Sequence, residues 1–137
     1  MQEFSIRNVL CAFDFNSRNH TTVWWALQMA AEFGAHLTIA HVTAGVELWG
    51  PGGSYVNTRW KKELVGDASQ HIAALQKEMG TQADVLIGSG DVPMVLSQAV
   101  KQTKADLLVS GSLPYGGQLR THGYAIICAV PIPVLSV

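Results

Sequence analysis

Five short apolar runs, separated by longer segments of helical periodicity, constrain the fold of this chain more than any other feature. The runs are Val9–Phe13, Leu37–Val42, Asp84–Gly88, Asp106–Gly111 and Pro133–Val137. Most are apolar at successive rather than alternate positions, which is typical of strands buried on both faces of a parallel sheet. Strands that alternate with helices predict an α/β domain with a five-stranded, mainly parallel sheet and helices on both faces.

The segments between the runs carry signals for helix ends. Gly34 stands where a C-cap glycine belongs, after apolar residues at helical spacing that begin near Val23. Asn57 is a good N-cap for a helix that runs to Gly80, and Asp91 is a good N-cap for the next one. A short last helix is expected over Thr121–Ala129, because Pro131 ends it.

Length and composition bound the class of protein. A chain of 137 residues with 48% hydrophobic residues is expected to form a single domain over residues 1–137. Its net charge of -1 gives no strong field toward nucleic acid or an anionic membrane. The sequence shows no signal peptide, and its longest apolar stretch is too short to span a bilayer. We therefore expect no nucleic-acid or membrane partner, and a cytoplasmic location.

Both cysteines and at least one of two adjacent tryptophans are predicted to be interior residues. Cys11 lies in an apolar strand-like run and Cys128 in an apolar helix-like one, which favours two small buried hydrophobes over a disulfide framework. Trp24 and Trp25 point to different faces of their helix, so at least one is expected to pack under the sheet.

Candidate ligand-binding residues lie at the ends of the apolar runs. Ligands of such folds collect at the carboxyl ends of the strands, near the point where strand order reverses. Asp14, Val42, Gly90 and Gly111 all lie at or just past these ends. A carboxylate at position 14 could bind a ligand amine or hydroxyl, or it could simply cap nearby backbone amides, and the sequence leaves both readings open.

The glycine-rich segment VSGSLPYGGQLRTHG, residues 109–123, raises the question of phosphate binding. Gly116 and Gly117 would expose backbone amides, Arg120 would add charge, and Thr121 would place a hydroxyl at a helix start, which together favour an anion. The segment matches neither common phosphate-loop fingerprint, so a surface turn that binds nothing is the alternative.

No catalytic or metal-binding constellation is evident. The five histidines lack metal-ligand spacing, and each is interpreted as a surface or packing residue. Ser112 does not stand in a nucleophile elbow. We therefore expect a protein without a metal site that is not a dedicated enzyme, and slow ATP hydrolysis is the third hypothesis that the sequence leaves open.

Taken in order, the pieces resemble the universal stress protein family over essentially the whole chain. The resemblance is carried by VLCAFDFNSRN near the start, LTIAHV after the first helix, GD followed by ADLLVSGS, and a closing PIPVLSV. It implies a Rossmann-like α/β sandwich, usually homodimeric. One branch of the family binds ATP and another does not.

The resemblance also implies roles for single residues. In the ATP-binding branch an aspartate after the first strand and the backbone of a valine after the second hold adenine, which correspond to Asp14 and Val42. Phosphates and ribose are held by G-x-x-G, a spacer and G-[ST]. Gly111 matches the first glycine, but Pro114 occupies the place of the second, and the spacer before Thr121 is shorter than the family pattern. Proline offers no amide hydrogen to a phosphate.

Two functions follow as hypotheses. The first is a stress-response module that binds ATP or AMP, with or without magnesium, and has no dedicated catalytic step. The second is a nucleotide-free homodimeric interaction module, favoured by the altered phosphate loop. In either case the closing strand, Val134 to Val137, is expected to pair with its copy in a homodimer, since an unpaired apolar edge is a liability.

Overall fold

The computed structural model describes residues 5–13, 19–44, 66–67, 69–111 and 123–137. Residues 66–67 and 69–79 are helical, and the latter stretch is called the helical segment 69–79 below. The other elements are β1 (Asn8–Phe13), α1 (Asn19–Phe33), β2 (His36–Ala44), β3 (Asp84–Gly90), α3 (Val92–Thr103), β4 (Leu107–Ser110), α5 (Gly123–Ala129) and β5 (Val134–Ser136). The five predicted strands are confirmed.

The strands form one sheet in the order β3-β2-β1-β4-β5. All four pairings between neighbours are parallel, as the consecutive apolar residues predicted. In β1 every residue from Val9 to Phe13 is buried, because helices cover both faces of this central strand. The chain proceeds from β1 outward to β3 and then restarts at β4 on the other side, so strand order reverses between β1 and β4.

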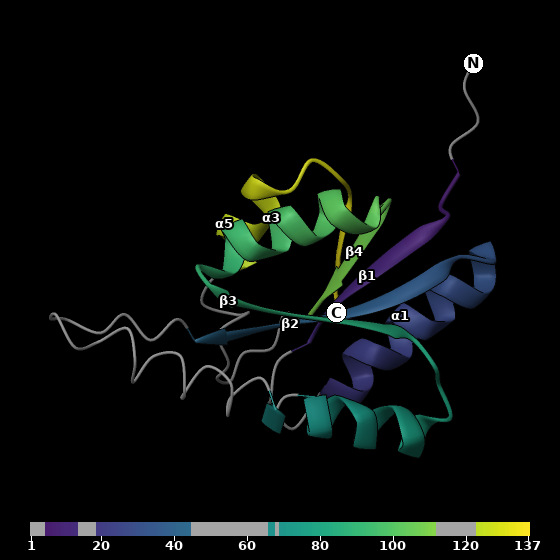
Figure 1. Cartoon of the computed structure of the whole chain (residues 1–137). Coiled ribbons are helices and arrows are strands. Elements are labelled where there is room, and N and C mark those ends of the chain that lie inside the picture. The colour runs from purple at the N-terminus through teal and green to yellow at the C-terminus, as the bar shows by residue number, and fades with distance from the viewer. Residues whose placement is uncertain (1–4, 14–18, 45–65, 68, 112–122) are drawn as a thin grey trace, which may run out of the picture.

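Helices cover both faces of the sheet, as predicted (Figure 1). One face packs against α1 and the helical segment 69–79, and its core includes Cys11, Ala26, Ile39 and Ile72. The opposite face packs against α3 and α5, with Leu10, Val42, Leu96, Leu108 and Ile126 among its core residues. Successive residues of a strand therefore alternate between two apolar layers.

The predicted helix ends at Gly34 and Asp91 are confirmed. Gly34 follows α1 with a φ of 62°, a left-handed conformation that glycine adopts without steric strain. The Asp91 side chain accepts a hydrogen bond of 3.2 Å from the backbone N–H of Met94 and so caps α3. Pro93 follows in the first turn, where its missing N–H leaves no helical bond unmade. Both signals were local, which is why the sequence was sufficient to locate them.

Two predictions of burial were wrong. Trp24 and Trp25 are 47% and 38% exposed and pack edge to face against each other at 5.2 Å between ring centroids. The sheet-facing side of α1 is formed by the smaller Val23, Ala26 and Ala30 instead. Cys11 is buried, but Cys128 is exposed. Ile126 in the short helix α5 and Val130 directly after it are both buried, and Cys128 between them lies on the opposite side.

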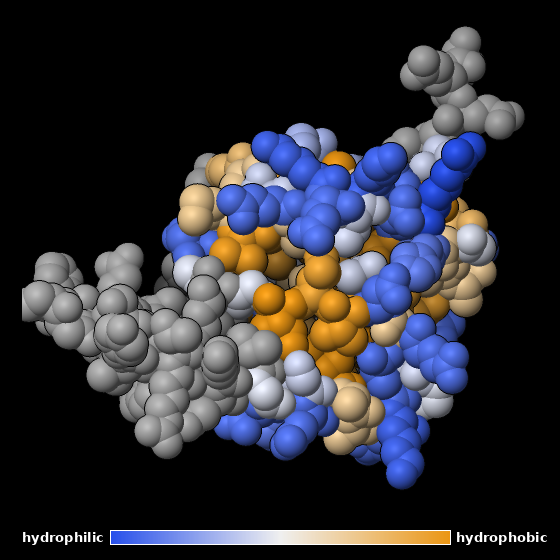
Figure 2. All heavy atoms as spheres, viewed as in Figure 1, coloured by the Kyte–Doolittle hydropathy of each residue, from blue (hydrophilic) through white to orange (hydrophobic). Residues whose placement is uncertain are grey.

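The sheet has β3 at one edge and β5 at the other. Figure 2 shows an apolar patch on the side where β3 runs, with polar residues above and below it. Val85 is 37% exposed there, and its neighbours Leu86 and Ile87 are half-buried. At the other edge Val134 and Leu135 are half-buried.

Candidate functional site at the carboxyl edge of the sheet

Three of the eight predicted site residues lie within the described part of the chain. These are Val42, Gly90 and Gly111. The other five lie outside the described residues: Asp14, Gly116, Gly117, Arg120 and Thr121.

Strand register brings the three described residues to the same edge of the sheet. Val42 lies in β2 opposite Gly88, and Gly90 ends β3 two residues further along, opposite Ala44. Gly111 directly follows β4, whose Val109 pairs with Cys11, so it lies level with the end of β1. The predicted residues therefore stand at the carboxyl ends of three strands, on both sides of β1 and next to the reversal of strand order.

Gly90 has a backbone role at this edge. Its φ of 124° belongs to a region that residues with a side chain rarely adopt. The next residue is Asp91, the N-cap of α3. A glycine is therefore needed to turn the chain from β3 directly into α3, whether or not a ligand is present.

Gly111 lies where the first turn of α1 approaches β4. A Cβ atom at this position would lie 3.2 Å from the Thr22 Oγ1 atom, which is closer than most real Cβ contacts. Thr22 itself is buried, as is Ser110 immediately before the glycine. The missing side chain thus allows α1 to pack closely against the end of β4.

His41 lies near the candidate site, and the sequence interpretation did not single it out. It precedes Val42 in β2 and is buried beside the last residue of β1. Its Nδ1 lies 2.9 Å from the Phe13 carbonyl oxygen, and its ring meets the Phe13 ring edge to face at 5.9 Å. The earlier interpretation as a packing residue is correct, but the hydrogen bond gives it a second role. Its position at the end of an apolar run was the available signal.

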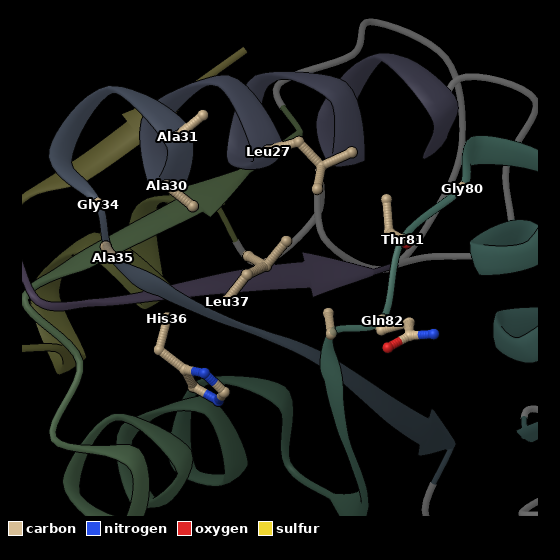
Figure 3. Close-up of a pocket in the computed structure, with 11 residues that line it drawn as sticks. Leu27, Ala30, Ala31, Gly34, Ala35, His36, Leu37, Gly80, Thr81 and Gln82 are labelled. Carbon is tan, nitrogen blue, oxygen red and sulfur yellow. The ribbon is translucent and has the colours of Figure 1, made fainter.

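A groove of about 460 Å³ lies at the amino ends of the strands, on the side of the sheet opposite its carboxyl edge. Figure 3 shows it between α1, which contributes Leu27 and Ala30, and the segment before β3, which contributes Thr81. Leu37 lies at the start of β2, and the His36 ring points away from α1 and pairs with Asp84 at 2.7 Å. The groove is thus at the amino ends of the strands and does not coincide with the predicted site.

Burial raises the pKa of the Cys11 thiol to about 12, so it stays neutral. Among the described residues, no three His, Cys, Asp or Glu side chains form a group that could hold a metal ion. No helix in this part of the chain is both long and apolar enough to cross a membrane.

Comparison with known proteins identifies the family. The sequence profile of the universal stress protein family matches residues 5–136, which is nearly the whole chain. The chain belongs to this family. No curated protein matches the sequence significantly.

Solved structures of other universal stress proteins share the fold. UspA from Lactobacillus plantarum superposes with a TM-score of 0.83 at 17% identity, covering 98% of this chain and 99% of that one. A universal stress protein in complex with cAMP gives 0.68 at 20% identity, with 98% of each chain covered. The Archaeoglobus fulgidus universal stress protein in complex with dAMP gives 0.62 at 14% identity, again with 98% of each covered. At these identities the likeness establishes the Rossmann-like fold.

Proposed function

We propose that this universal stress protein binds an adenine nucleotide, ATP or AMP, at the carboxyl edge of its sheet and acts without a dedicated catalytic step. The observation that carries the proposal is the convergence of Val42, Gly90 and Gly111 at that edge, beside the reversal of strand order. Ligands of open α/β sheets bind at this place. Complexes of related proteins with cAMP and dAMP support the choice of an adenine nucleotide.

The residues divide between the two ends of the nucleotide. Asp14, directly after β1, would accept hydrogen bonds from the adenine, and the main chain of Val42 on the neighbouring strand would face the base. Gly116, Gly117, Arg120 and Thr121 would supply amides, a positive charge and a hydroxyl to the phosphates, with magnesium neutralising the remaining charge of ATP. This arrangement would replace the phosphate loop of the family, whose second glycine is Pro114 in this chain.

A catalytic step is not part of the proposal. Phosphoryl transfer needs a positioned cation and a group that orients the nucleophile. The segment from Gly111 to Thr121 contains no lysine for the usual phosphate contact. The protein would therefore report on nucleotide level to other proteins in the cytoplasm rather than consume the nucleotide.

Calorimetry tests the proposal directly. ATP, ADP and AMP are titrated at millimolar concentration with and without magnesium, and ligand released from the purified protein is identified by mass spectrometry. Asp14→Ala should weaken binding about tenfold or more, because a hydrogen bond to a charged group contributes about 1.5–3 kcal/mol. Asp67→Ala, which removes an exposed carboxylate from a helical stretch far along the chain, is the matched control. Absence of binding heat for all three nucleotides would refute nucleotide binding.

A second candidate function is a nucleotide-free homodimeric interaction module. The observation that favours it is the position of β5 at the sheet edge, where its outer side has no neighbouring strand within the described part of the chain. Backbone N–H groups alternate in direction along a strand. The N–H of Val137 donates to the Ser110 carbonyl of β4, so the N–H of Ser136 points outward. A second copy of β5 could pair with this edge about a two-fold axis.

The homodimer can be tested without disturbing the pairing of β5 with β4. Ser136→Pro removes an outward N–H and is tolerated on an edge strand, so we expect monomers with nearly native stability. Leu135→Lys should also shift sedimentation toward monomer. Val85→Lys, at the exposed position of the other edge strand, is the control and should leave the dimer intact. A dimer mass that survives Ser136→Pro and Leu135→Lys, with native melting curves, would place association on another surface.

A further inference from the structure

His41 links β2 to the end of β1, and these are the two strands that carry the proposed adenine contacts. It stands in β2 immediately before Val42, and strand register pairs it with Phe13, the last residue of β1 and the one before Asp14. Only 7% of its surface is exposed. The 2.9 Å contact from Nδ1 to the Phe13 carbonyl oxygen therefore joins a side chain of β2 to the main chain at the end of β1.

The chemistry of this contact fixes the form of the ring. A carbonyl oxygen can only accept a hydrogen bond, so Nδ1 must carry the proton. In the neutral imidazole the proton is then absent from Nε2, and the ring has one defined tautomer. The Phe13 ring packs edge to face against the His41 imidazole at an interplanar angle of 76°, and this contact also restrains the imidazole. Hydrogen bond and aromatic contact together select one orientation of His41.

Holding the Phe13 carbonyl has a consequence for the chain that follows it. The peptide unit is planar, so a hydrogen bond that fixes its oxygen also restricts the direction in which the backbone continues. An apolar side chain could fill the same space, but it could not hold the carbonyl oxygen. The tie from His41 therefore does more at this edge than fill volume.

We propose that His41 is a positioning residue for the adenine end of the nucleotide site, which it serves by holding the exit of β1 in register with Val42. The inference rests on the proposed nucleotide-binding function. It assigns His41 no contact with the ligand. Its effect should be confined to recognition of the base, because the proposed function assigns the phosphates to Gly116, Gly117, Arg120 and Thr121 and not to the strands that His41 joins.

Three substitutions separate the hydrogen bond from the volume of the side chain. His41→Asn places an amide N–H where Nδ1 stands and leaves empty space, His41→Gln places its amide near the position of Nε2, and His41→Phe keeps the ring without a donor. The probes are AMP, which contains the base, and ribose 5-phosphate, which lacks it. Affinities are measured by calorimetry and melting temperatures by circular dichroism.

We expect the affinity for AMP to follow the hydrogen bond rather than the melting temperature. His41→Phe and His41→Gln should weaken AMP binding roughly three- to tenfold, in line with one hydrogen bond, and leave ribose 5-phosphate binding unchanged. His41→Asn should stay within about twofold of the wild type for AMP, although its cavity lowers the melting temperature. The positioning role would be overturned by any of three results. These are equal losses of affinity for AMP and ribose 5-phosphate, a loss of AMP affinity in His41→Asn equal to that in His41→Phe, or unchanged AMP affinity in all three variants.

Hydrogen–deuterium exchange distinguishes failure of this inference from failure of the proposed function. Peptides that contain Phe13 or Val42 should exchange faster in His41→Phe than in the wild type and return toward wild-type rates in His41→Asn, while peptides of α3 serve as the internal reference. Unchanged exchange in His41→Phe would refute the tie itself. If His41→Phe exchanges faster but the wild type binds no AMP, the hydrogen bond from His41 to Phe13 is supported, and both the nucleotide function and the adenine role assigned to His41 are refuted.

Discussion

Replacing Gly88 with alanine tests how closely α3 packs against β3. Gly88 lies in the edge strand β3, directly opposite Val42 in the strand register. A Cβ atom at this position would lie 2.5 Å from the Cγ1 atom of Val95 in α3. Carbon atoms in van der Waals contact are about 3.5–4.0 Å apart, so the new methyl group would overlap Val95 by roughly 1 Å.

The overlap allows the destabilisation to be worked out. Val95 cannot easily turn away, because a β-branched side chain in a helix has one strongly preferred rotamer. Overpacking of this kind costs about 1–3 kcal/mol. Removal of a glycine from a strand offsets about 0.5–1 kcal/mol of this, since alanine loses less backbone entropy on folding. We expect a net loss of about 1–2 kcal/mol, or roughly 2–8 °C in melting temperature for a chain of this size.

A double-mutant cycle with Val95→Ala is the appropriate assay. Stabilities of the wild type, both single variants and the double variant are measured by urea unfolding. In the Val95→Ala background the clash is gone, so Gly88→Ala should be neutral or stabilising by up to about 1 kcal/mol. If Gly88→Ala is harmless in the wild type, or equally harmful in both backgrounds, the close approach of α3 to β3 is refuted.

Three further predictions concern other parts of the fold. Ellman's reagent should modify Cys128 quickly in the native protein and Cys11 only after unfolding. Above pH 9 the Cys11 thiol ionises in the unfolded chain but not in the folded chain, where its pKa is about 12. The free energy of unfolding should therefore fall by about 1.4 kcal/mol per pH unit, and Cys11→Ala should remove this slope. Asp106→Ala should lower the free energy of unfolding by about 1–2 kcal/mol, because Asp106 Oδ2 accepts hydrogen bonds of 2.8 and 3.1 Å from two backbone N–H groups at the start of β1. An unchanged urea unfolding curve would contradict this. Gly111→Ala should destabilise by up to about 1 kcal/mol, and Thr22→Ala should relieve that loss in the double variant; equal losses in both backgrounds would count against the contact.

The strands and helix caps could be predicted because their signals are local. A strand covered on both faces must be apolar at successive positions, and β1 is buried throughout from Val9 to Phe13. A helix end that needs a positive φ favours glycine, and Gly34 meets that need. Neither inference requires knowledge of which segment packs against which, so one sequence was sufficient.

The errors and omissions arise from contacts between distant segments. Burial of Trp24 or Trp25 depends on how α1 is rotated over the sheet, and the small Ala26 and Ala30 face the sheet because they let the helix approach closely. The role of His41 depends on a register that joins two strands 28 residues apart in the chain. Periodicity within a segment carries no information about either relation.

The fold itself explains two of the glycines among the candidate site residues. Gly90 is required by its φ of 124° at the turn into α3, and Gly111 by the approach of Thr22, so both would be selected in a member of the family that binds nothing. Substitution at either position changes the backbone and the ligand site together. Asp14 and Thr121 carry side chains to which the resemblance assigns ligand roles, so Asp14→Ala and Thr121→Ala, with both glycines kept, separate nucleotide binding from the fold. Loss of binding in these variants at an unchanged melting temperature would favour the nucleotide-binding branch over the interaction module.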